Sequence, residues 1–235
     1  MGEARDQERR IAAMFDRISP RYDRLNRVLS FGTDVAWRRR AAELARLAPG
    51  ERALDVGAGT GDLALALLAA TPRSSAIALD LSAGMLMVYR RRASRLGLRP
   101  AAVLGSAEAI PMPAGSVDRV VTSFTLRNVR DLTGVLREFR RVLRPAGRAV
   151  ILELSHPPNP IFGALYRSYF DRLAPRIAVA LGGDADAYRY LPRSLRPFPR
   201  PERLAEMLRE VGFARVRFER LAFGIAAIHV AEAAD

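Results

Sequence analysis

The stretch that decides the fold is "ERALDVGAGTGDLALALLAA", residues 51–70. It begins as a short apolar run, continues with glycines at positions 57, 59 and 61, and ends in a helical pattern. Glycines between a strand and a helix let a ligand approach bare backbone, with the N–H groups of the helix start pointing at it. The stretch therefore predicts a strand, a ligand-binding turn and a helix.

The chain on both sides of this stretch alternates between strand-like and helical segments. Strands are predicted at "AIALD" (76–80), "AAVLG" (101–105), "VDRVVTSF" (117–124) and "RAVILEL" (148–154), with helical patterns between most of them. This alternation is typical of an α/β fold, a mostly parallel Rossmann-like sheet with helices on both faces. The last two strand-like segments, within residues 214–234, follow each other closely, and we expect both as an antiparallel addition at the sheet edge.

We expect one domain with four parts. These are a basic helical cover (1–47), a ligand-binding core (48–156), an aromatic and basic insert (157–200), and a final helix with two strands (201–235). The insert carries Phe162, Tyr166, Tyr169, Phe170 and Leu173 at helical spacing, which predicts an amphipathic helix. Its apolar face would either pack on the sheet or cover an apolar substrate, and both interpretations remain open.

The composition excludes some chemistry and leaves the meaning of the charge open. The chain has no cysteine and only two histidines, which excludes disulfides and thiolate nucleophiles and argues against a Cys or His metal site. All 38 basic residues are arginine and the formal net charge is +13. A GC-rich genome explains this composition, and attraction to nucleic acid or an anionic membrane is the functional alternative. No apolar run is long enough for a membrane span and no signal peptide pattern is visible, so we expect a soluble, intracellular protein.

Three details of the glycine loop and the next strand favour one kind of ligand. The third glycine comes one residue earlier than the dinucleotide fingerprint requires. Asp62 places a negative charge at the helix start, where a pyrophosphate would otherwise lie. Asp80 ends the second strand and can accept hydrogen bonds from both ribose hydroxyls. A nucleoside with a cationic, amine-bearing tail fits these features, and S-adenosylmethionine is such a nucleoside.

At this point the chain resembles the class I S-adenosylmethionine-dependent methyltransferases. The resemblance implies a seven-stranded sheet whose last strand is antiparallel, with the ligand lying across the carboxyl ends of the strands. It also implies cofactor-binding residues: Asp55, Gly57, Gly59 and Thr60 for the methionine part, Asp80 for the ribose, Ser106 and Ala107 of "GSAE" for the adenine, and Ser123 beside the cofactor.

Five separated motifs narrow the resemblance to one family. They are "MFDRISPRYDRLNRVLSFGTDVAWR" (14–38), "SFTLRNVRD" (123–131), "RVLRPAGRAVILELS" (141–155), "YRYLPRSLRPFP" (188–199) and "GIAAIHVA" (224–231). Together they resemble the UbiE/MenG family of ubiquinone/menaquinone biosynthesis C-methyltransferases. The chain departs from the family pattern at Leu25, Asp34, Ala58, Ser106 and Ala146. None of these changes removes a group that the chemistry requires.

This resemblance implies methylation of a ring carbon in a polyprenylated quinol, with S-adenosylmethionine as co-substrate and no metal. We expect demethylmenaquinol as the acceptor; the alternative is the ubiquinone precursor 2-polyprenyl-6-methoxy-1,4-benzoquinol, or both. Arg127 would stabilise the phenolate or position a proton-accepting water, Asn128 would orient the ring, and Tyr22 would complete the site. His156 is a second-ranked candidate base. The structural alternatives are an Arg127–Asp131 salt bridge and a helix N-cap at Asn128.

Other functions remain as rivals. A methyltransferase for another apolar phenolic lipid, an RNA or protein methyltransferase, and a non-catalytic partner in a quinone-synthesis complex are the three alternatives. The fourth strand ends in "SFTL" rather than in the Asn/Asp-Pro-Pro-aromatic pattern of amino-group methylation, and no RNA-binding module is visible, so we expect no nucleic-acid partner. We expect a cytoplasmic enzyme that meets the inner face of the cell membrane peripherally and transiently. A homodimer is one assembly that we consider.

Overall fold

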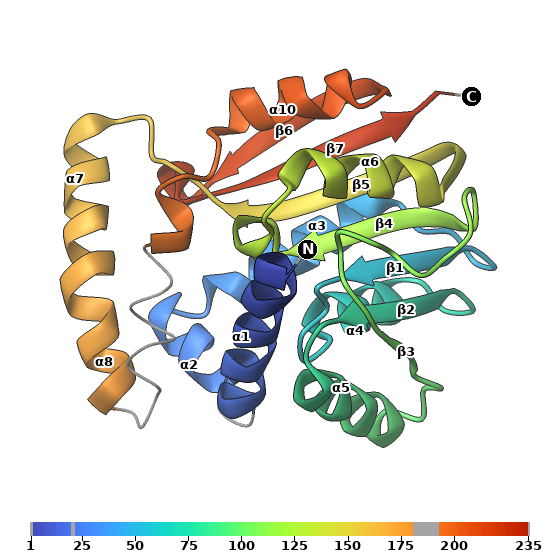
Figure 1. The fold of residues 1–235 in the computed structure, drawn as a ribbon, viewed down its shortest axis with the longest axis horizontal. Coiled ribbons are helices and arrows are strands. Elements are labelled where there is room, and N and C mark those ends of the chain that lie inside the picture. The colour runs from blue at the N-terminus through green and yellow to red at the C-terminus, as the bar shows by residue number, and fades with distance from the viewer. Residues whose placement is uncertain (1, 20–21, 181–192, 235) are drawn as a thin grey trace.

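Seven strands form a single sheet in a computed structural model that describes residues 2–19, 22–180 and 193–234 (Figure 1). The strands are β1 (Arg52–Val56), β2 (Ser75–Asp80), β3 (Ala101–Leu104), β4 (Val117–Ser123), β5 (Leu143–Leu154), β6 (Phe213–Leu221) and β7 (Ala226–Ala233). Their order across the sheet is β3-β2-β1-β4-β5-β7-β6. The pairs from β3 to β5 are parallel, as the alternation of segments in the sequence predicts.

The last strand is antiparallel and the two final strands form an antiparallel pair at the sheet edge, both as expected, whereas their order was not predicted. β7 lies between β5 and β6 and is antiparallel to both, so β6 at the sheet edge runs parallel to β5. Burial explains the order. Six consecutive residues of β7, 226–231, are buried, whereas β6 has exposed or half-buried residues after Phe213. The strand that is apolar on both faces takes the interior position and the arginine-bearing strand takes the edge.

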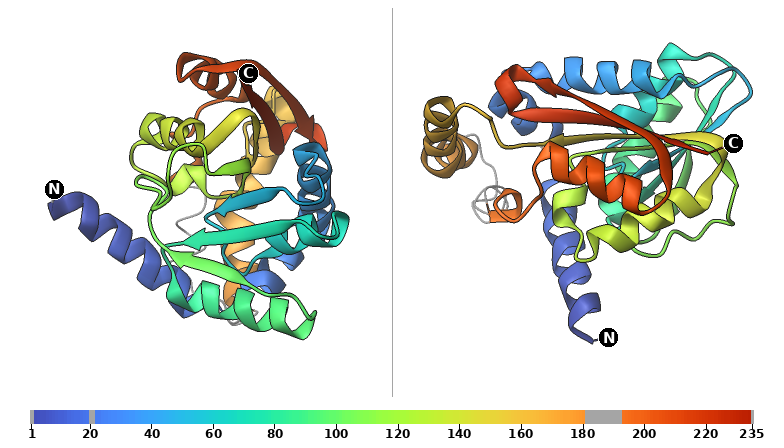
Figure 2. Two further views of the ribbon diagram at one scale, coloured as in Figure 1. Left: turned by 90° about the vertical axis from the view of Figure 1, so that its right-hand side faces the viewer. Right: turned by 90° about the horizontal axis from the view of Figure 1, so that it is seen from above.

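Helices cover both faces of the sheet (Figure 2). They are α1 (Gly2–Ile18), α2 (Tyr22–Leu29), α3 (Thr33–Ala45), α4 (Asp62–Ala70), α5 (Ala83–Arg95), α6 (Leu132–Val142), α7 (Pro160–Ser168), α8 (Ala174–Ala180) and α10 (Pro201–Glu210). Side chains of α3, α4 and α5 share one buried core with one face of the sheet, and those of α6 and α10 share a second core with the other face.

Adjacent strand residues enter different cores because side chains alternate across a strand. In β4, Val121 packs in the core beneath α3 to α5 and Val120 in the core beneath α6 and α10. In β5, Leu152 and Ile151 divide in the same way. Short runs of consecutive apolar residues are therefore strands buried on both faces.

The two segments outside the sheet-and-helix core lie at the carboxyl ends of the strands. α1 packs beside α5, and Ile18, Leu25 and Met85 form a small separate core there. The predicted amphipathic helix is present: α7, the π-helical turn Tyr169–Leu173 and α8 form one rod beyond α2 (Figure 1). Residues 188–192 of the motif at 188–199 lie outside the described residues. Among the described helices, none combines the length and apolarity that a membrane crossing requires.

Candidate active site

A cleft at the carboxyl ends of β1 to β4 brings most of the predicted cofactor residues together. Its lining includes Gly57 and Gly59 after β1, Asp80 at the end of β2, Ser106 and Ala107 after β3, and Ser123 at the end of β4. Residues from four strands meet here because parallel strands end at the same edge of a sheet. The predicted residues that line the cleft thus come from separate parts of the sequence.

The glycine loop passes so close to neighbouring chain that one position needs glycine for two reasons. Gly57 has a φ of 66°, and a Cβ there would lie 2.2 Å from the Thr125 side chain. Gly59 has a φ of 56°, but a Cβ there would meet nothing within 4 Å. The loop therefore presents bare backbone to the cleft, which is the form of contact that the sequence predicted for the methionine part of the ligand.

Asp80 is held in place by backbone donors from the loop and from the start of α5. Its Oδ2 accepts from Gly59 N at 2.8 Å and its Oδ1 from Ser82 N at 2.8 Å. Burial raises the pKa of this carboxyl, and the backbone donors oppose the shift. A fixed carboxylate at the end of the second strand fits a pair of ribose hydroxyls.

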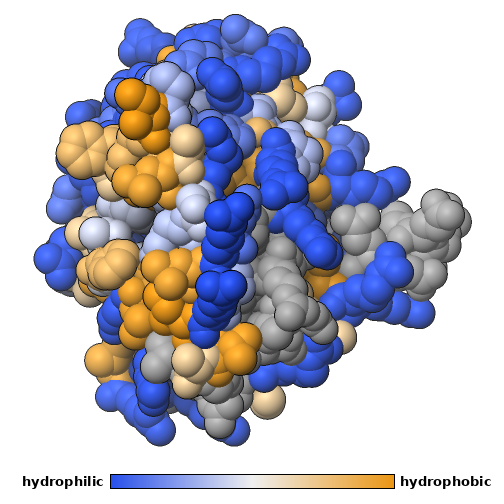
Figure 3. Space-filling model, turned by 90° about the vertical axis from the view of Figure 1, so that its left-hand side faces the viewer, coloured by the Kyte–Doolittle hydropathy of each residue, from blue (hydrophilic) through white to orange (hydrophobic). Residues whose placement is uncertain are grey.

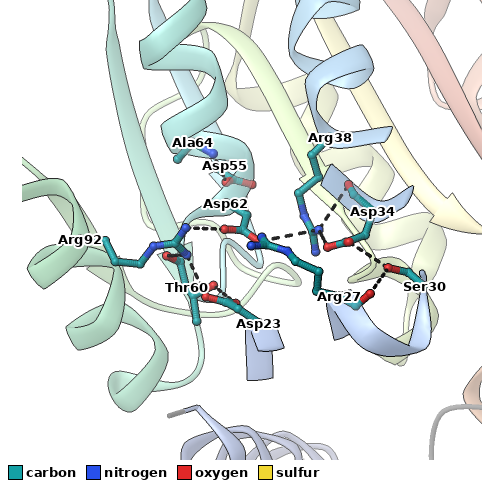
Figure 4. A network of polar contacts seen from close by, with 10 residues as sticks. All are labelled: Asp23, Arg27, Ser30, Asp34, Arg38, Asp55, Thr60, Asp62, Ala64 and Arg92. Atoms are coloured by element: carbon teal, nitrogen blue, oxygen red, sulfur yellow. Dashed lines mark hydrogen bonds and ion pairs between the residues drawn. The ribbon is translucent and has the colours of Figure 1, made fainter. Parts of the chain in front are cut away.

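Two predicted cofactor residues, Asp55 and Thr60, are not part of the cleft lining, and Figure 4 shows the polar contacts that they make. Asp55 is fully buried, and its Oδ2 accepts from Ala64 N at 2.9 Å at the start of α4. Burial raises the pKa of Asp55 to about 7. Thr60 donates its hydroxyl to Asp23 at 2.6 Å. Asp55 thereby ties the end of β1 to the start of α4, and Thr60 ties the glycine loop to α2.

The charge of Asp62 is balanced by nearby arginines. Its carboxylate pairs with Arg92 at 2.6 Å and lies 3.7 Å from Arg38. The negative charge that the sequence places at the helix start is therefore partly offset in the fold. Both arginines also form ion pairs with residues of the helical cover: Arg92 pairs with Asp23 of α2 at 3.0 Å, and Arg38, itself in α3, pairs with Asp34 of the same helix at 2.5 Å (Figure 4). This network fastens α2 and α3 to the glycine loop.

Helix α1 forms the outer wall of the cleft. Ile11, Ala12 and Phe15 line it, and the Ser106 hydroxyl donates to Glu8 at 2.5 Å. With α1 in this position the cleft has a volume of about 90 Å³. Pockets for organic ligands measure roughly 300–1,000 Å³, so we expect α1 to move outward when a nucleoside enters.

A second, larger cavity of about 680 Å³ lies between the helical cover and the rod formed by α7 and α8. Its walls are mostly aromatic and aliphatic, and all five predicted residues of the amphipathic helix line it. The apolar face of that helix therefore faces a cavity rather than packing flat on the sheet.

The cleft and the cavity meet at two side chains. Tyr22 and Phe124 line both. Phe124 follows β4 with a φ of 59°, a conformation that non-glycine residues rarely adopt and that concentrates at functional sites. Burial raises the pKa of the Tyr22 phenol, although the charges of Arg127 and Arg38 act to lower it. Tyr22 therefore stays a neutral hydroxyl at the boundary between the two spaces.

Arg127 lines the apolar cavity as a buried, paired cation. Its Nη1 lies 2.5 Å from Oε1 of Glu153 and donates to the Phe124 carbonyl at 2.7 Å, while its Nε has no partner. The alternative of a surface salt bridge with Asp131 was wrong, since Asp131 instead caps α6 by accepting from Gly134 N at 2.8 Å.

Asn128 lines the cleft, on the other side of the junction from Arg127. Its Oδ1 is buried and has no partner. The alternative reading as a helix N-cap was wrong, because the cap of α6 is Asp131. His156, the second-ranked base, lies in neither lining, and its Nε2 is 3.0 Å from the Phe198 carbonyl.

Sequence reasoning missed two polar residues of the site, Glu153 and Tyr166. Glu153 stands in "VILEL", a charged residue inside a buried strand, and such a residue needs a partner. The sequence alone could therefore have marked Glu153 as a buried charge that needs a partner. Tyr166 was assigned to an apolar helix face, and nothing in its spacing marks its hydroxyl, which is buried without a partner in the structure.

Comparison with known proteins agrees with this geometry. The family model described as the ubiE/COQ5 methyltransferase family matches residues 3–233. A Thermus thermophilus protein named demethylmenaquinone methyltransferase is 46% identical over 219 residues, covering 93% of this chain and 99% of its own. A Syntrophotalea carbinolica protein named ubiquinone/menaquinone biosynthesis C-methyltransferase UbiE is 42% identical, covering 92% of this chain and 91% of its own.

Among solved structures, the [4+2]-cyclase SpnF superposes with a TM-score of 0.73 over 97% of each chain. At 18% identity this shows a shared fold and nothing about the reaction. The family match and the two close relatives carry more: the chain is an S-adenosylmethionine-dependent methyltransferase that belongs to the ubiE/COQ5 methyltransferase family.

Proposed function

We propose that this enzyme methylates a ring carbon of a polyprenylated quinol, converting demethylmenaquinol to menaquinol. One observation carries the proposal: a glycine-lined cleft and an apolar cavity meet at Tyr22 and Phe124. A methyl donor in the cleft and an aromatic acceptor in the cavity would face each other across this junction. The name of the Thermus relative favours demethylmenaquinol. The ubiquinone precursor, alone or in addition, is the second candidate, favoured by the name of the Syntrophotalea relative.

The cavity suits the acceptor in size and in chemistry. Its volume of about 680 Å³ falls within the usual range for organic ligands. The walls offer rings such as Phe162 and Phe170 to the quinol ring and the first isoprene units. The remaining tail would leave through the mouth of the cavity, beside α7.

The polar residues at the junction would assist the chemistry. A quinol hydroxyl loses its proton, and the neighbouring ring carbon attacks the methyl group. A carbon–carbon bond forms as the carbon–sulfur bond breaks and sulfur takes the electron pair. The methylated carbon then loses its proton, which restores the aromatic ring. Arg127 would stabilise the phenolate or position the water that accepts the proton, since a guanidinium stays protonated and is not itself a base.

Asn128 and Tyr22 would act from the sides of the junction. The unpartnered Oδ1 of Asn128 faces a buried environment and would accept a hydrogen bond that orients the reacting groups. Tyr22 would contact both substrates as a neutral hydroxyl. S-adenosylmethionine would supply the methyl group, and we propose no role for a metal, which unchanged activity in excess chelator would support.

The cofactor roles expected from the sequence are proposed in a modified form. Gly57 and Gly59 would meet the methionine part through backbone, Asp80 the ribose, Ser106 and Ala107 the adenine, and Ser123 the region near the sulfonium. Asp55 and Thr60 would act indirectly by holding the loop, since neither lines the cleft.

We also propose that the cavity mouth meets the inner face of the cell membrane, where a polyprenyl quinol resides. Four large apolar side chains from three segments are exposed: Phe31 (80%), Ile161 (81%), Leu165 (68%) and Phe223 (84%). Ring contacts join these segments, with Phe31 6.1 Å from Tyr169 and Phe223 5.6 Å from Phe162 between ring centroids. Figure 3 shows apolar side chains gathered on this face among charged ones. We call these four residues the apolar rim.

A methyl-transfer assay tests the proposed reaction. Labelled S-adenosylmethionine is offered with reduced demethylmenaquinol, with the reduced benzoquinol precursor and with bulk RNA, each in detergent. We expect label in the naphthoquinol product, located on the ring carbon by mass spectrometry. Label in the benzoquinol alone would make the benzoquinol precursor the substrate in place of demethylmenaquinol. Label in RNA alone would overturn the proposed function.

A further inference from the structure

One hydroxyl of the apolar cavity has no partner. Tyr166 extends from α7, its residue is 9% exposed, and its Oη is buried without a hydrogen bond. In folded proteins most buried hydroxyls are paired, so an unpaired one that lines a cavity is free to bond with a ligand or with water in that cavity. Arg127 lines the same cavity and its Nε is also buried and unpartnered. Two polar groups in a mostly apolar cavity thus lack partners.

A neighbouring tyrosine in the same cavity differs from Tyr166 in its hydrogen bonding. Tyr169 lines the same cavity one turn further on, and its hydroxyl donates to the Leu29 carbonyl at 3.1 Å. The two phenols therefore differ in one respect that matters here: Tyr169 is satisfied by protein and Tyr166 is not.

The Tyr166 ring is fixed and remains a hydrogen-bond donor. It packs against Phe170 with ring centroids 5.0 Å apart. Burial raises the pKa of its hydroxyl, and the charge of Arg127 acts in the opposite direction. At working pH the phenol keeps its proton.

A 1,4-quinol has two oxygens at opposite ends of its ring, and the proposed function uses only one of them. In that function Arg127 would face the oxygen beside the methylated carbon. We propose that Tyr166 donates a hydrogen bond to the second, para oxygen, so that the cavity selects aromatic rings with two para oxygens over monophenols. This inference rests on the proposed function and adds a specificity determinant to it.

The physical reason for selectivity is the unpaired donor itself. An acceptor that lacks the para oxygen would leave the Tyr166 hydroxyl buried and unsatisfied, whereas a quinol satisfies it. Loss of one such hydrogen bond from a neutral donor corresponds to roughly a 10- to 100-fold change in kcat/KM. Both the naphthoquinol and the benzoquinol carry the para oxygen, so this site does not discriminate between them.

The test combines one variant with one altered substrate. Wild type, Tyr166→Phe and the matched control Tyr169→Phe are assayed with demethylmenaquinol and with its 4-deoxy analogue, which has a single hydroxyl beside the methylated carbon. We expect the wild type to lose about 10- to 100-fold in kcat/KM on the deoxy analogue. Tyr166→Phe should lose the same factor on the quinol and nothing further on the analogue.

Several results would overturn the inference. If Tyr166→Phe slows both substrates equally, the hydroxyl has a structural role; if it slows neither, the hydroxyl makes no contact with the substrate. If Tyr169→Phe abolishes the discrimination as well, the effect belongs to the helix rather than to one hydroxyl. Thermal unfolding of each variant identifies a folding defect. A wild type inactive on every quinol would overturn the proposed function, and the inference with it.

Discussion

Arg127 and Glu153 form a buried ion pair in the site. Taking both charges out of water costs free energy, and their attraction alone does not always repay it. Here the backbone N–H groups of Arg127 and Leu154 also donate to Glu153, at 3.3 and 2.8 Å. We infer that Glu153 is a positioning residue that holds the Arg127 guanidinium toward the cavity.

Glu153→Gln tests this role. The neutral amide keeps the shape but loses the charge that fixes Arg127, so we expect kcat to fall roughly 10- to 100-fold with a smaller change in KM. The matched control is Glu232→Gln, which breaks another Arg–Glu pair in the same sheet, that of Arg148 at 2.7 Å, away from both cavities. Equal losses in the two variants would contradict a positioning role.

The glycine loop gives a second comparison of neighbouring residues. Gly57→Ala places a methyl group 2.2 Å from the Thr125 side chain in addition to a strained φ, whereas Gly59→Ala brings only the strained φ. We expect the first variant to lose about 2–4 kcal/mol of unfolding free energy in urea and the second about 1–2 kcal/mol. Similar losses would mean that the contact with Thr125 relaxes freely.

At the scale of residues, the sequence predicts the loop glycines and Asp80 as cofactor residues for local reasons, and the structure places them in one cleft lining. The loop glycines and Asp80 follow directly from a strand–turn–helix pattern. The partner of Arg127 did not follow, because Glu153 lies 26 residues away and the local candidate, Asp131, has another role. Arg127 lies in the turn after β4 and Glu153 in β5, so their pairing depends on how the two segments pack in space, which local sequence patterns do not fix.

At the scale of elements, the positions of the strands and helices along the chain were predicted well. Which elements lie side by side in space was predicted less well. Periodicity marks an amphipathic helix or a buried strand wherever it lies, so the rod from α7 to α8 could be predicted in part. The position of β7 between β5 and β6 depends on which strand is apolar on both faces, a comparison between segments rather than within one.

The burial of β7 predicts that the protein loses stability as the pH falls. His229 in this strand is buried, donates from Nε2 to the Pro201 carbonyl at 2.9 Å, and has its pKa lowered by burial to about 4 from 6.5. Between these values only the unfolded state takes up the proton, so this residue lowers the unfolding free energy as pH falls from 6.5 to 4. The loss amounts to about 3 kcal/mol.

The measurement is urea unfolding of wild type and His229→Gln between pH 4 and pH 8. Other titrating groups contribute equally to both proteins, so the difference between the two curves isolates the histidine. We expect the unfolding free energy of the variant to rise steadily relative to that of the wild type as the pH falls below 6.5. A difference that stays constant with pH would show that His229 titrates normally in the folded state.

On the scale of the whole molecule, the apolar rim and the net charge of +13 would act together at an anionic bilayer. We expect the double variant Phe31→Ser/Phe223→Ser to bind anionic vesicles about tenfold or more weakly than wild type, measured by co-sedimentation. Leu104→Ser is the control, because Leu104 is 61% exposed on β3, away from α7 (Figure 1). Equal binding by all three proteins would contradict docking through the rim.

The oligomeric state is a separate question. Light scattering on the same proteins without vesicles distinguishes a monomer of 25.9 kDa from a homodimer.

The large-scale organisation was partly readable because the motifs of one family extend over nearly the whole chain. What the sequence does not contain is the cavity between the cover and the insert. That space arises because α7 and the π-helical turn after it stand away from the sheet, and their apolar face lines it instead of filling it. Only the assembled structure brings Tyr22, Phe124 and Arg127 to one junction.

The most direct test of this account is the steady-state rate of methyl transfer to demethylmenaquinol by wild type, Arg127→Ala and Arg137→Ala. Arg137 is exposed on α6 and lines neither cavity, so it controls for the loss of one positive charge. The account predicts that Arg127→Ala loses at least about 100-fold in kcat while S-adenosylmethionine still binds, and that Arg137→Ala matches the wild type. Full activity in Arg127→Ala would contradict a reaction centred on this junction.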